Sequence, residues 1–130
     1  MSKVVLKRIK ESMKELGINY QFKKWKGHPI YPYFVGSYQE VPTGGEDGMQ
    51  ETSFILTGFA RSYGNVDGVL QLEEAKEKIK DYFKLSLVNT DSGSVVAIFY
   101  ANAFGDLPTG DAELEKIEIN LNIKEWSVKK

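Results

Sequence analysis

The stretch that decides the fold is Ile117-Glu118-Ile119-Asn120-Leu121-Asn122-Ile123-Lys124, in which aliphatic and polar side chains alternate at every position. Successive side chains of a β-strand point to opposite sides, so this alternation predicts a strand that is buried on one face only. We expect Ile119 and Leu121 to face the helices, because amphipathic helices need an apolar partner. Trp126 continues with the opposite parity, which predicts a bulge near Glu125 that returns the apolar side inward.

Two amphipathic helices are predicted to cover that apolar face. The first spans residues 2–16, and the second spans roughly residues 70–84. In both, apolar residues recur every three or four positions while charged residues fill the opposite side, as in a helix packed on a core. Gly17 follows the first helix directly and is expected to end it.

The remaining strands are predicted at residues 18–23, 33–41, 52–61 and 95–100. The last of these is apolar at every position, which predicts a central strand covered on both sides. The order of elements is therefore α-β-β-β-α-β-β. It predicts an α+β domain with a mainly antiparallel sheet of about five strands and two helices on one face.

Two glycine-rich segments are predicted to be exposed loops. Residues 42–50, PTGGEDGMQ, form a long and mobile hairpin loop between the second and third strands, because three glycines and a proline leave them too polar to bury. Residues 101–112 form the second loop, in which Phe104 and Leu107 are the only large apolar residues.

Composition limits the class of protein. The 130 residues are a usual length for one domain, so we expect residues 1–130 to fold as a single domain. A formal charge of -1 gives no global attraction to nucleic acid or to an anionic membrane, and the absence of cysteine excludes disulfides and thiol catalysis. The opening MSKVVLKRIKESMKEL lacks the unbroken apolar stretch of a signal peptide, so we expect a soluble cytoplasmic protein.

No catalytic or metal-binding motif stands out. His28 is the only histidine, which excludes a conventional His-based triad, and we interpret it as a turn residue. Glu46, Asp47 and Glu51 lie close in sequence but match no calcium-loop pattern, so we interpret them as part of a solubilising loop. Neither a phosphate-binding loop nor a dinucleotide fingerprint follows a predicted strand. We expect no catalytic residue, no metal site and no cofactor.

A basic patch surrounds Trp25. The neighbouring Lys23, Lys24 and Lys26 supply the cations that accompany a stacking ring in proteins that bind single-stranded nucleic acid. Acidic residues are available as neighbours, however, and a solvated surface is the simpler interpretation. We expect no specific nucleic acid binding.

Over most of its length the chain is similar to the small tail terminator or tail completion proteins of siphophages and myophages, which also occur in prophages. The resemblance rests on a short leading helix, on the second helix over Leu72 to Phe83, and on four further stretches: Tyr33-Phe34-Val35-Gly36-Ser37-Tyr38, Gly44-Gly45-Glu46-Asp47-Gly48, Phe54-Ile55-Leu56-Thr57-Gly58-Phe59 and Ile117-Glu118-Ile119-Asn120-Leu121.

This resemblance implies a structural protein that catalyses nothing. Such proteins assemble into a ring, usually of six copies, that caps the finished tail tube and joins it to the head connector. The implied partners are further copies of the chain, the tail tube protein and the head connector proteins, without a membrane. The implied location is the host cytoplasm during assembly and the tail of the virion afterwards.

The two glycine-rich loops are the predicted docking elements. A hairpin loop that is mobile in the free subunit can become ordered when it meets a neighbour or the tube. The predicted partner-binding residues are Thr43, Gly44, Gly45, Glu46, Asp47, Gly48, Met49, Phe104 and Leu107.

The alternative is a small-molecule or peptide binding domain, or a small enzyme, with a pocket lined by Trp25, Tyr31 and Tyr33. The size of the protein in solution at micromolar concentration distinguishes such a binding domain or enzyme from a ring. An immunity-type inhibitor would be expected to carry a marked charge excess for a charged target, and the chain has none.

Overall fold

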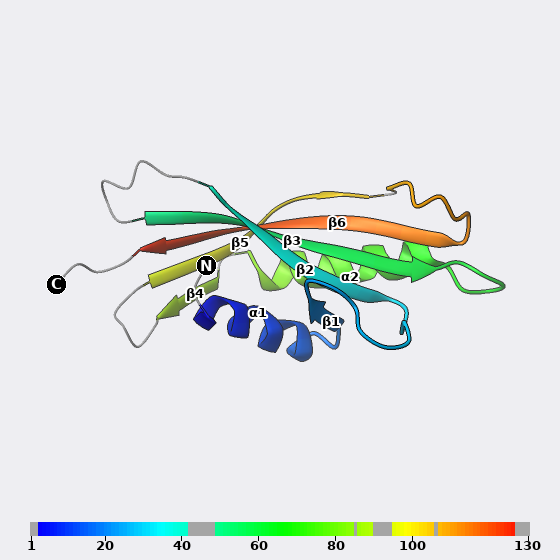
Figure 1. Cartoon of the computed structure of the whole chain (residues 1–130), viewed down its shortest axis with the longest axis horizontal. Helices are drawn as coiled ribbons and strands as arrows, with labels where there is room; N and C mark the ends of the chain where they lie inside the picture. Colours follow the sequence, from blue (N-terminus) through cyan, green and yellow to red (C-terminus); the bar gives the residue numbers. More distant parts are fainter. Residues whose placement is uncertain (1–2, 42–48, 85, 90–94, 106, 127–130) are drawn as a thin grey trace.

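The computed structural model describes residues 3–41, 49–84, 86–89, 95–105 and 107–126 of the chain. Two helices and six strands make up this part of the chain (Figure 1). In chain order they are α1 (Lys3–Glu15), β1 (Asn19–Phe22), β2 (Tyr33–Val41), β3 (Met49–Arg61), α2 (Gly68–Tyr82), β4 (Ser86–Asn89), β5 (Val95–Phe104) and β6 (Leu114–Trp126).

The strands form one sheet in the order β1-β2-β3-β6-β5-β4. All neighbouring pairs are antiparallel except β1 and β2, which run parallel. The predicted α+β class, the mainly antiparallel sheet and the predicted order of elements are confirmed. The structure adds β4, a short strand at the edge of the sheet that the sequence pattern did not predict.

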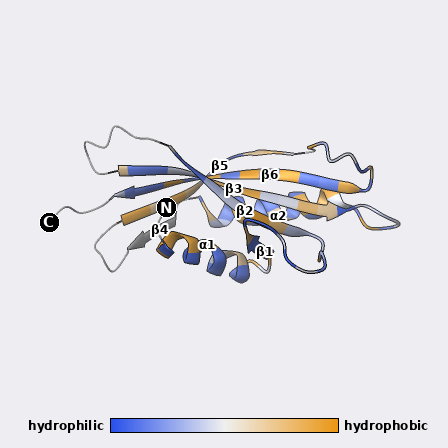
Figure 2. Cartoon of the chain, in the orientation of Figure 1, coloured by the Kyte–Doolittle hydropathy of each residue, from blue (hydrophilic) through white to orange (hydrophobic). Residues whose placement is uncertain are grey.

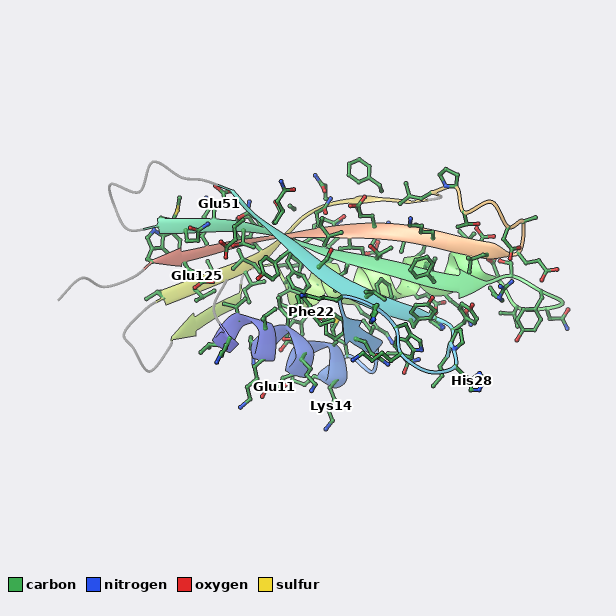
Figure 3. The ribbon with its side chains drawn as sticks, viewed as in Figure 1. Glu11, Lys14, Phe22, His28, Glu51 and Glu125 are labelled. Carbon is green, nitrogen blue, oxygen red and sulfur yellow. The ribbon has the colours of Figure 1, made fainter. Side chains whose placement is uncertain are left out.

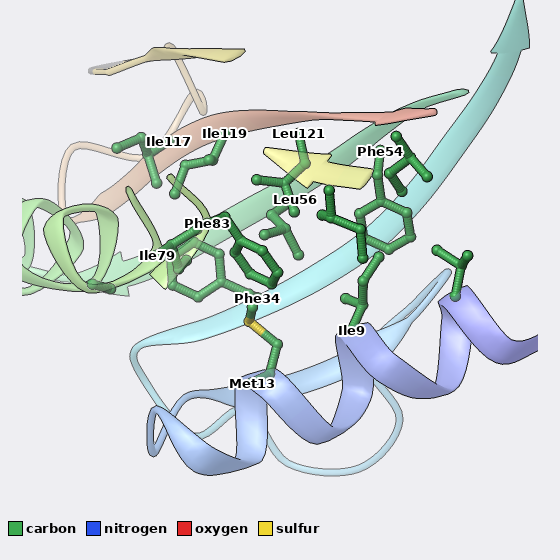
Figure 4. Close-up of a cluster of buried hydrophobic side chains, with 14 of the residues drawn as sticks. Ile9, Met13, Phe34, Phe54, Leu56, Ile79, Phe83, Ile117, Ile119 and Leu121 are labelled. Carbon is green, nitrogen blue, oxygen red and sulfur yellow. The ribbon is translucent and has the colours of Figure 1, made fainter. Parts of the chain in front are cut away.

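Both helices lie on the same side of the sheet (Figure 1), where their apolar sides meet the alternating strands. Residues on this side of β3 and β6 are buried at every second position, and Figure 2 shows the matching alternation of hydropathy along β6. Ile119 and Leu121 are fully buried against the helices, as predicted. Figure 4 shows these side chains pointing from the sheet toward Ile9 and Met13 of α1.

Two glycines let aromatic rings reach the core side of the sheet. A Cβ atom on Gly58 would lie 2.4 Å from the ring of Phe34, which occupies the space above that glycine. A Cβ atom on Gly36 would lie 2.5 Å from the Tyr20 hydroxyl and 2.7 Å from the Phe54 ring. Both glycines are therefore needed for close packing of the rings.

The predicted bulge near Glu125 is wrong. The register of β6 with β3 is unbroken from Leu114 to Trp126, and the irregularity lies instead in β5, between Tyr100 and Asn102. Trp126 therefore lies on the side of the sheet away from the helices, where it is opposite Met49 of β3 and Val95 of β5.

The expectation that both sides of β5 are covered is met only in part. β5 lies inside the sheet, between β6 and β4, and its residues 96–98 are buried. Both helices lie on one side, however, so Ala97 is buried on the other side without a covering layer. It is small and lies opposite the long side chain of Lys124, whose ammonium group is 5.8 Å from the centre of the Phe99 ring.

Candidate docking surfaces

The face of the sheet away from the helices is the largest candidate surface, and we call it the uncovered face. None of the described helices or strands packs against it (Figure 1). Its residues on β3 and β6 are half-buried, because neighbouring side chains shelter one another. It mixes apolar and polar residues: Val35, Ile55, Phe59 and Phe99 with Ser53, Thr57, Asn120 and Asn122.

An aromatic cluster occupies one end of the uncovered face and consists of Trp25, Tyr31, Tyr33 and Phe59. Tyr33 is its centre, with ring centroids 4.8 Å from Trp25, 5.4 Å from Tyr31 and 5.2 Å from Phe59. The indole Nε1 of Trp25 donates a hydrogen bond of 3.0 Å to the carbonyl oxygen of His28, which fixes the ring. The structure thus brings together the three aromatic residues of the predicted pocket.

Phe59 was not predicted as a member of the aromatic cluster. It comes from β3, where the register places it directly opposite Tyr33 of β2. The alternation in β3 could have assigned Phe59 to the side away from the core, but the pairing register was needed to identify its neighbour. Beside the cluster lies an open hollow of about 390 Å³, lined in part by Trp25, Lys23 and Lys24.

Cations surround the aromatic cluster. The guanidinium group of Arg61 lies 5.5 Å from the centre of the Tyr31 ring, and the ammonium group of Lys116 lies 5.9 Å from that of Phe59. Burial raises the pKa of Tyr33, and the neighbouring Tyr31 adds to this effect. Cations close to ring faces are attracted to them, so the cluster and its cations form one polar and aromatic surface.

An ion pair links the same end of β3 to the loop before β6. Arg61 Nη1 lies 3.2 Å from Asp111 Oδ2. The pKa of Asp111 is held below its usual value, first by the hydrogen bond that the Glu113 N–H donates to its carboxylate and then by Arg61. The pair is exposed, so its contribution to stability is small.

The predicted partner-binding residues fall into two groups. Thr43, Gly44, Gly45, Glu46, Asp47 and Gly48 lie outside the described residues, as does most of the loop predicted to be mobile. The three remaining residues are described.

Met49 begins β3 and lies opposite Trp126, half-buried on the uncovered face. Phe104 ends β5 on the same face, opposite Glu118, and 53% of its surface is exposed. Leu107 is half-buried, and its N–H donates a hydrogen bond of 3.1 Å to the carbonyl oxygen of Lys116.

The structure does not bring the two predicted loops together. β2 ends at Val41 and β3 begins at Met49 at one end of the sheet (Figure 1). β5 continues to Phe104, so the loop predicted over residues 101–112 starts later than expected, and β6 begins at Leu114 at the other end of the sheet. β3 runs from Met49 to Arg61 between these ends, which at about 3.4 Å per residue is a distance of about 40 Å. Phe104 shares its end of the uncovered face with the aromatic cluster, and Met49 lies at the opposite end with Trp126.

A second surface, on the helix side, is a hollow of about 580 Å³ between α1 and the edge strand β1, which we call the basic groove. Half-buried Leu6, Tyr20 and Phe22 form its apolar floor, and Phe22 lies between α1 and the sheet in Figure 3. Its other lining residues are polar or basic: Lys7, Lys10, Gln21, Lys24 and Lys26. Among the described residues that line it, none is acidic.

Hydrogen bonds fix the backbone of the turn after β1, which carries Lys24 and Lys26 of the basic groove. Gln21 accepts a hydrogen bond of 2.9 Å from the backbone N–H of Lys26 and donates one of 3.2 Å to its carbonyl oxygen. Lys23, in the left-handed conformation at φ 71°, donates a backbone hydrogen bond of 2.7 Å to the Gly36 carbonyl. The basic groove was not predicted from the sequence, because no local pattern shows that α1 lies beside β1.

Within the described ranges, no group of three or more His, Asp or Glu side chains could hold a metal ion. Nor is any helix in those ranges long and apolar enough to span a membrane. His28 is exposed in the loop between β1 and β2 (Figure 3), and its described interaction is through its backbone carbonyl.

Comparisons with protein-family models and with curated proteins found no match for the chain.

Proposed function

We propose that the chain is a structural subunit of a phage or prophage tail that terminates the tail tube and joins it to the head connector through ring self-assembly. The observation that carries the proposal is the uncovered face, which has the predicted docking residues Met49 and Phe104 at its opposite ends. A subunit that bridges a tube and a connector needs contact surfaces directed toward opposite sides. The resemblance of the sequence to tail terminator proteins supports the same role.

The chemistry of the uncovered face suits association. Its apolar and aromatic side chains are half-buried within the subunit, so a partner that covers them removes further apolar surface from water. Among the residues of that face whose exposure the structure describes, Phe104 is the most exposed large apolar one. The proposed role involves docking without turnover, with the loops contributing more than any single charged residue.

The partners in this role are further copies of the chain, the tail tube protein and the head connector proteins. The resemblance implies six copies in the ring. The role places the protein in the host cytoplasm during assembly and in the virion tail afterwards. It requires neither a membrane nor a specific nucleic acid.

The test measures the mass of the purified protein by light scattering over a range of micromolar concentrations, alone and with tail tubes. Phe104→Ser and a shortened segment 43–48, which leaves Met49 and Gln50 of β3 in place, are expected to abolish ring formation while the melting temperature stays nearly unchanged. Leu70→Ser is the matched control, because Leu70 has 54% of its surface exposed on α2, close to the 53% of Phe104. Loop variants that assemble normally, or a wild-type chain that never forms a ring, would contradict the proposal.

The aromatic cluster favours a second candidate, a small-molecule or peptide binding domain. Three rings of the cluster, Trp25, Tyr33 and Phe59, line an open hollow that also borders Lys23 and Lys24. The ring of Tyr33 lies 4.8 Å from that of Trp25 and 5.2 Å from that of Phe59, centroid to centroid, and this arrangement suits a planar or extended anionic ligand. A monomeric protein whose tryptophan fluorescence is quenched by a ligand, with the quenching lost in Tyr33→Ala, would support this candidate over the tail role.

A further inference from the structure

The basic groove concentrates positive charge in a way that the fold does not explain. Lys7 and Lys10 extend from α1, and Lys24 and Lys26 extend from the turn after β1. All four side chains are exposed. In the described part of the chain, no carboxylate lies within 4 Å of any of these ammonium groups, although Glu11 is four residues beyond Lys7 on the same helix.

Like charges around one hollow repel each other, and an anionic occupant would relieve that repulsion. The occupant must also fit an apolar floor, because Leu6, Tyr20 and Phe22 offer apolar surface between the two pairs of lysines. Phe22 also stacks on Tyr38 of β2, with ring centroids 6.0 Å apart, so the apolar floor continues toward the far end of β2. The groove therefore fits an acidic and slender segment of chain.

The chain itself contains such a segment. Gly44-Gly45-Glu46-Asp47-Gly48 carries two adjacent carboxylates between glycines, which add no side-chain bulk on either side. Other acidic residues fit less well. Glu73 and Asp111 are already paired with Lys76 and Arg61, and the remaining carboxylates of α2 project from a helix about 10 Å wide.

We propose that the basic groove of one copy receives the segment Gly44 to Gly48 of a neighbouring copy. This inference rests on the proposed function, and it names the contact that would link the subunits of the ring. Glu46 and Asp47 pair with lysines of the groove, and the glycine backbone lies along its apolar floor.

The distance between the groove and the start of the acidic segment favours a neighbouring copy over the same chain. Gly36 of β2 pairs with Phe22 at the groove, and β2 continues five residues further to Val41, about 17 Å away, before the acidic segment begins. Donor and acceptor are also different surfaces of the same chain, so the contact is head-to-tail. Head-to-tail contacts close into rings when the rotation between copies permits it.

Charge reversal tests the proposal on the full chain. Lys10→Glu with Lys24→Glu makes the groove acidic, and Glu46→Lys with Asp47→Lys makes the segment basic. Each double variant is expected to weaken self-association by roughly tenfold or more, measured by light scattering or native mass spectrometry. Lys14→Glu with Lys78→Glu is the matched control, because these exposed lysines lie outside the groove and carry the same change in net charge.

A mixing experiment then shows whether the segment in the groove comes from a neighbouring copy or from the same chain. An equal mixture of the two double variants is expected to form rings of alternating subunits, because each groove again meets a segment of opposite charge. If the segment fills its own groove, mixing restores nothing, and the proposal is overturned.

The outcomes for this contact and for the proposed function are distinct. If wild-type rings form and the groove variants form them equally well, the groove contact is wrong while the ring function stands. If the wild-type chain forms no ring alone or with tail tubes, both are wrong. Circular dichroism of each variant confirms that the exposed substitutions leave the fold intact.

Discussion

The two faces of the sheet are built from the same strands and differ in what lies against them. On β3 and β6, the residues that point toward the helices are buried, and those between them point to the uncovered face and are half-buried. The buried positions of the first face on β3 and β6 carry aliphatic or aromatic residues except for Thr52 and Gly58, whereas the second face mixes aromatic, amide, hydroxyl and charged side chains. This difference indicates that the helix side determines the stability of the fold and that the uncovered face is available for contacts.

The largest expected effect comes from deleting side-chain atoms on the helix side. Leu121 is 1% exposed in the core, and Leu121→Ala should lower the free energy of unfolding by about 2 to 5 kcal/mol through lost burial and a cavity. Ile55→Ala removes a side chain of similar size from the uncovered face and should cost about 1 kcal/mol or less, since Ile55 is only half-buried. Urea denaturation measures both values.

Equal losses for these two variants would contradict the contrast between the faces. If the loss for Ile55→Ala grows with protein concentration, another copy of the chain covers that face in solution. The same measurement therefore separates a stabilising role within one subunit from a role in association.

A smaller loss of stability is expected from adding a methyl group on the helix side. In Gly58→Ala the new Cβ would lie 2.4 Å from the Phe34 ring and 2.9 Å from Ile117 Cγ2, so the ring must move. Overpacking of this kind costs about 1 to 3 kcal/mol. Gly64→Ala is a poor control because Gly64 has a positive φ of 56°, whereas Gly105 has only the Glu73 carboxylate at 3.6 Å and provides a suitable one. Thermal denaturation of Gly58→Ala and Gly105→Ala should give a clear drop only for the first.

The smallest expected effect on stability comes from the ion pair between Arg61 and Asp111 at the end of the uncovered face, and it depends on pH. The pKa of Asp111 is lowered from its usual 3.8, so its contribution to stability is present above that value and is lost as the pH falls through the lowered pKa. Asp111→Asn should therefore be less stable than the wild type near neutral pH, and the difference should vanish in acid. Urea midpoints measured over an acidic pH series check this, and a difference that grows as the pH falls would contradict it.

The sequence predicted the helix side of the molecule well, because burial leaves a periodic pattern. The helix predicted at residues 2–16 is α1, Lys3–Glu15, and Gly17 follows it at a φ of 71° as its expected end. The alternation of β6 identified Ile119 and Leu121 as core residues. In each case one side of the element is packed, so apolar residues recur with the period of that element.

The features that the sequence missed depend on pairing between distant segments. β4 has four residues, too few to show a period, and it is recognised as a strand by its pairing with β5. Trp126 was expected to return to the core, whereas the pairing places it opposite Met49 on the uncovered face. The basic groove is formed where α1 meets β1, and the aromatic cluster is formed where β2 meets β3. No local pattern contains that information.

The unequal lengths of the helices and strands have a consequence for how the molecule could be resized. α2 has 15 residues and is about 22 Å long, whereas the 13 residues of β3 and of β6 extend about 40 Å. Part of each long strand therefore extends past the helix that it packs against. Removing two residues from both strands in that part would shorten the span between the two loops by about 7 Å and leave every side chain on its original face. Removing one residue would instead exchange the faces of everything beyond the deletion. The sheet is thus a spacer that can be adjusted only in steps of two residues.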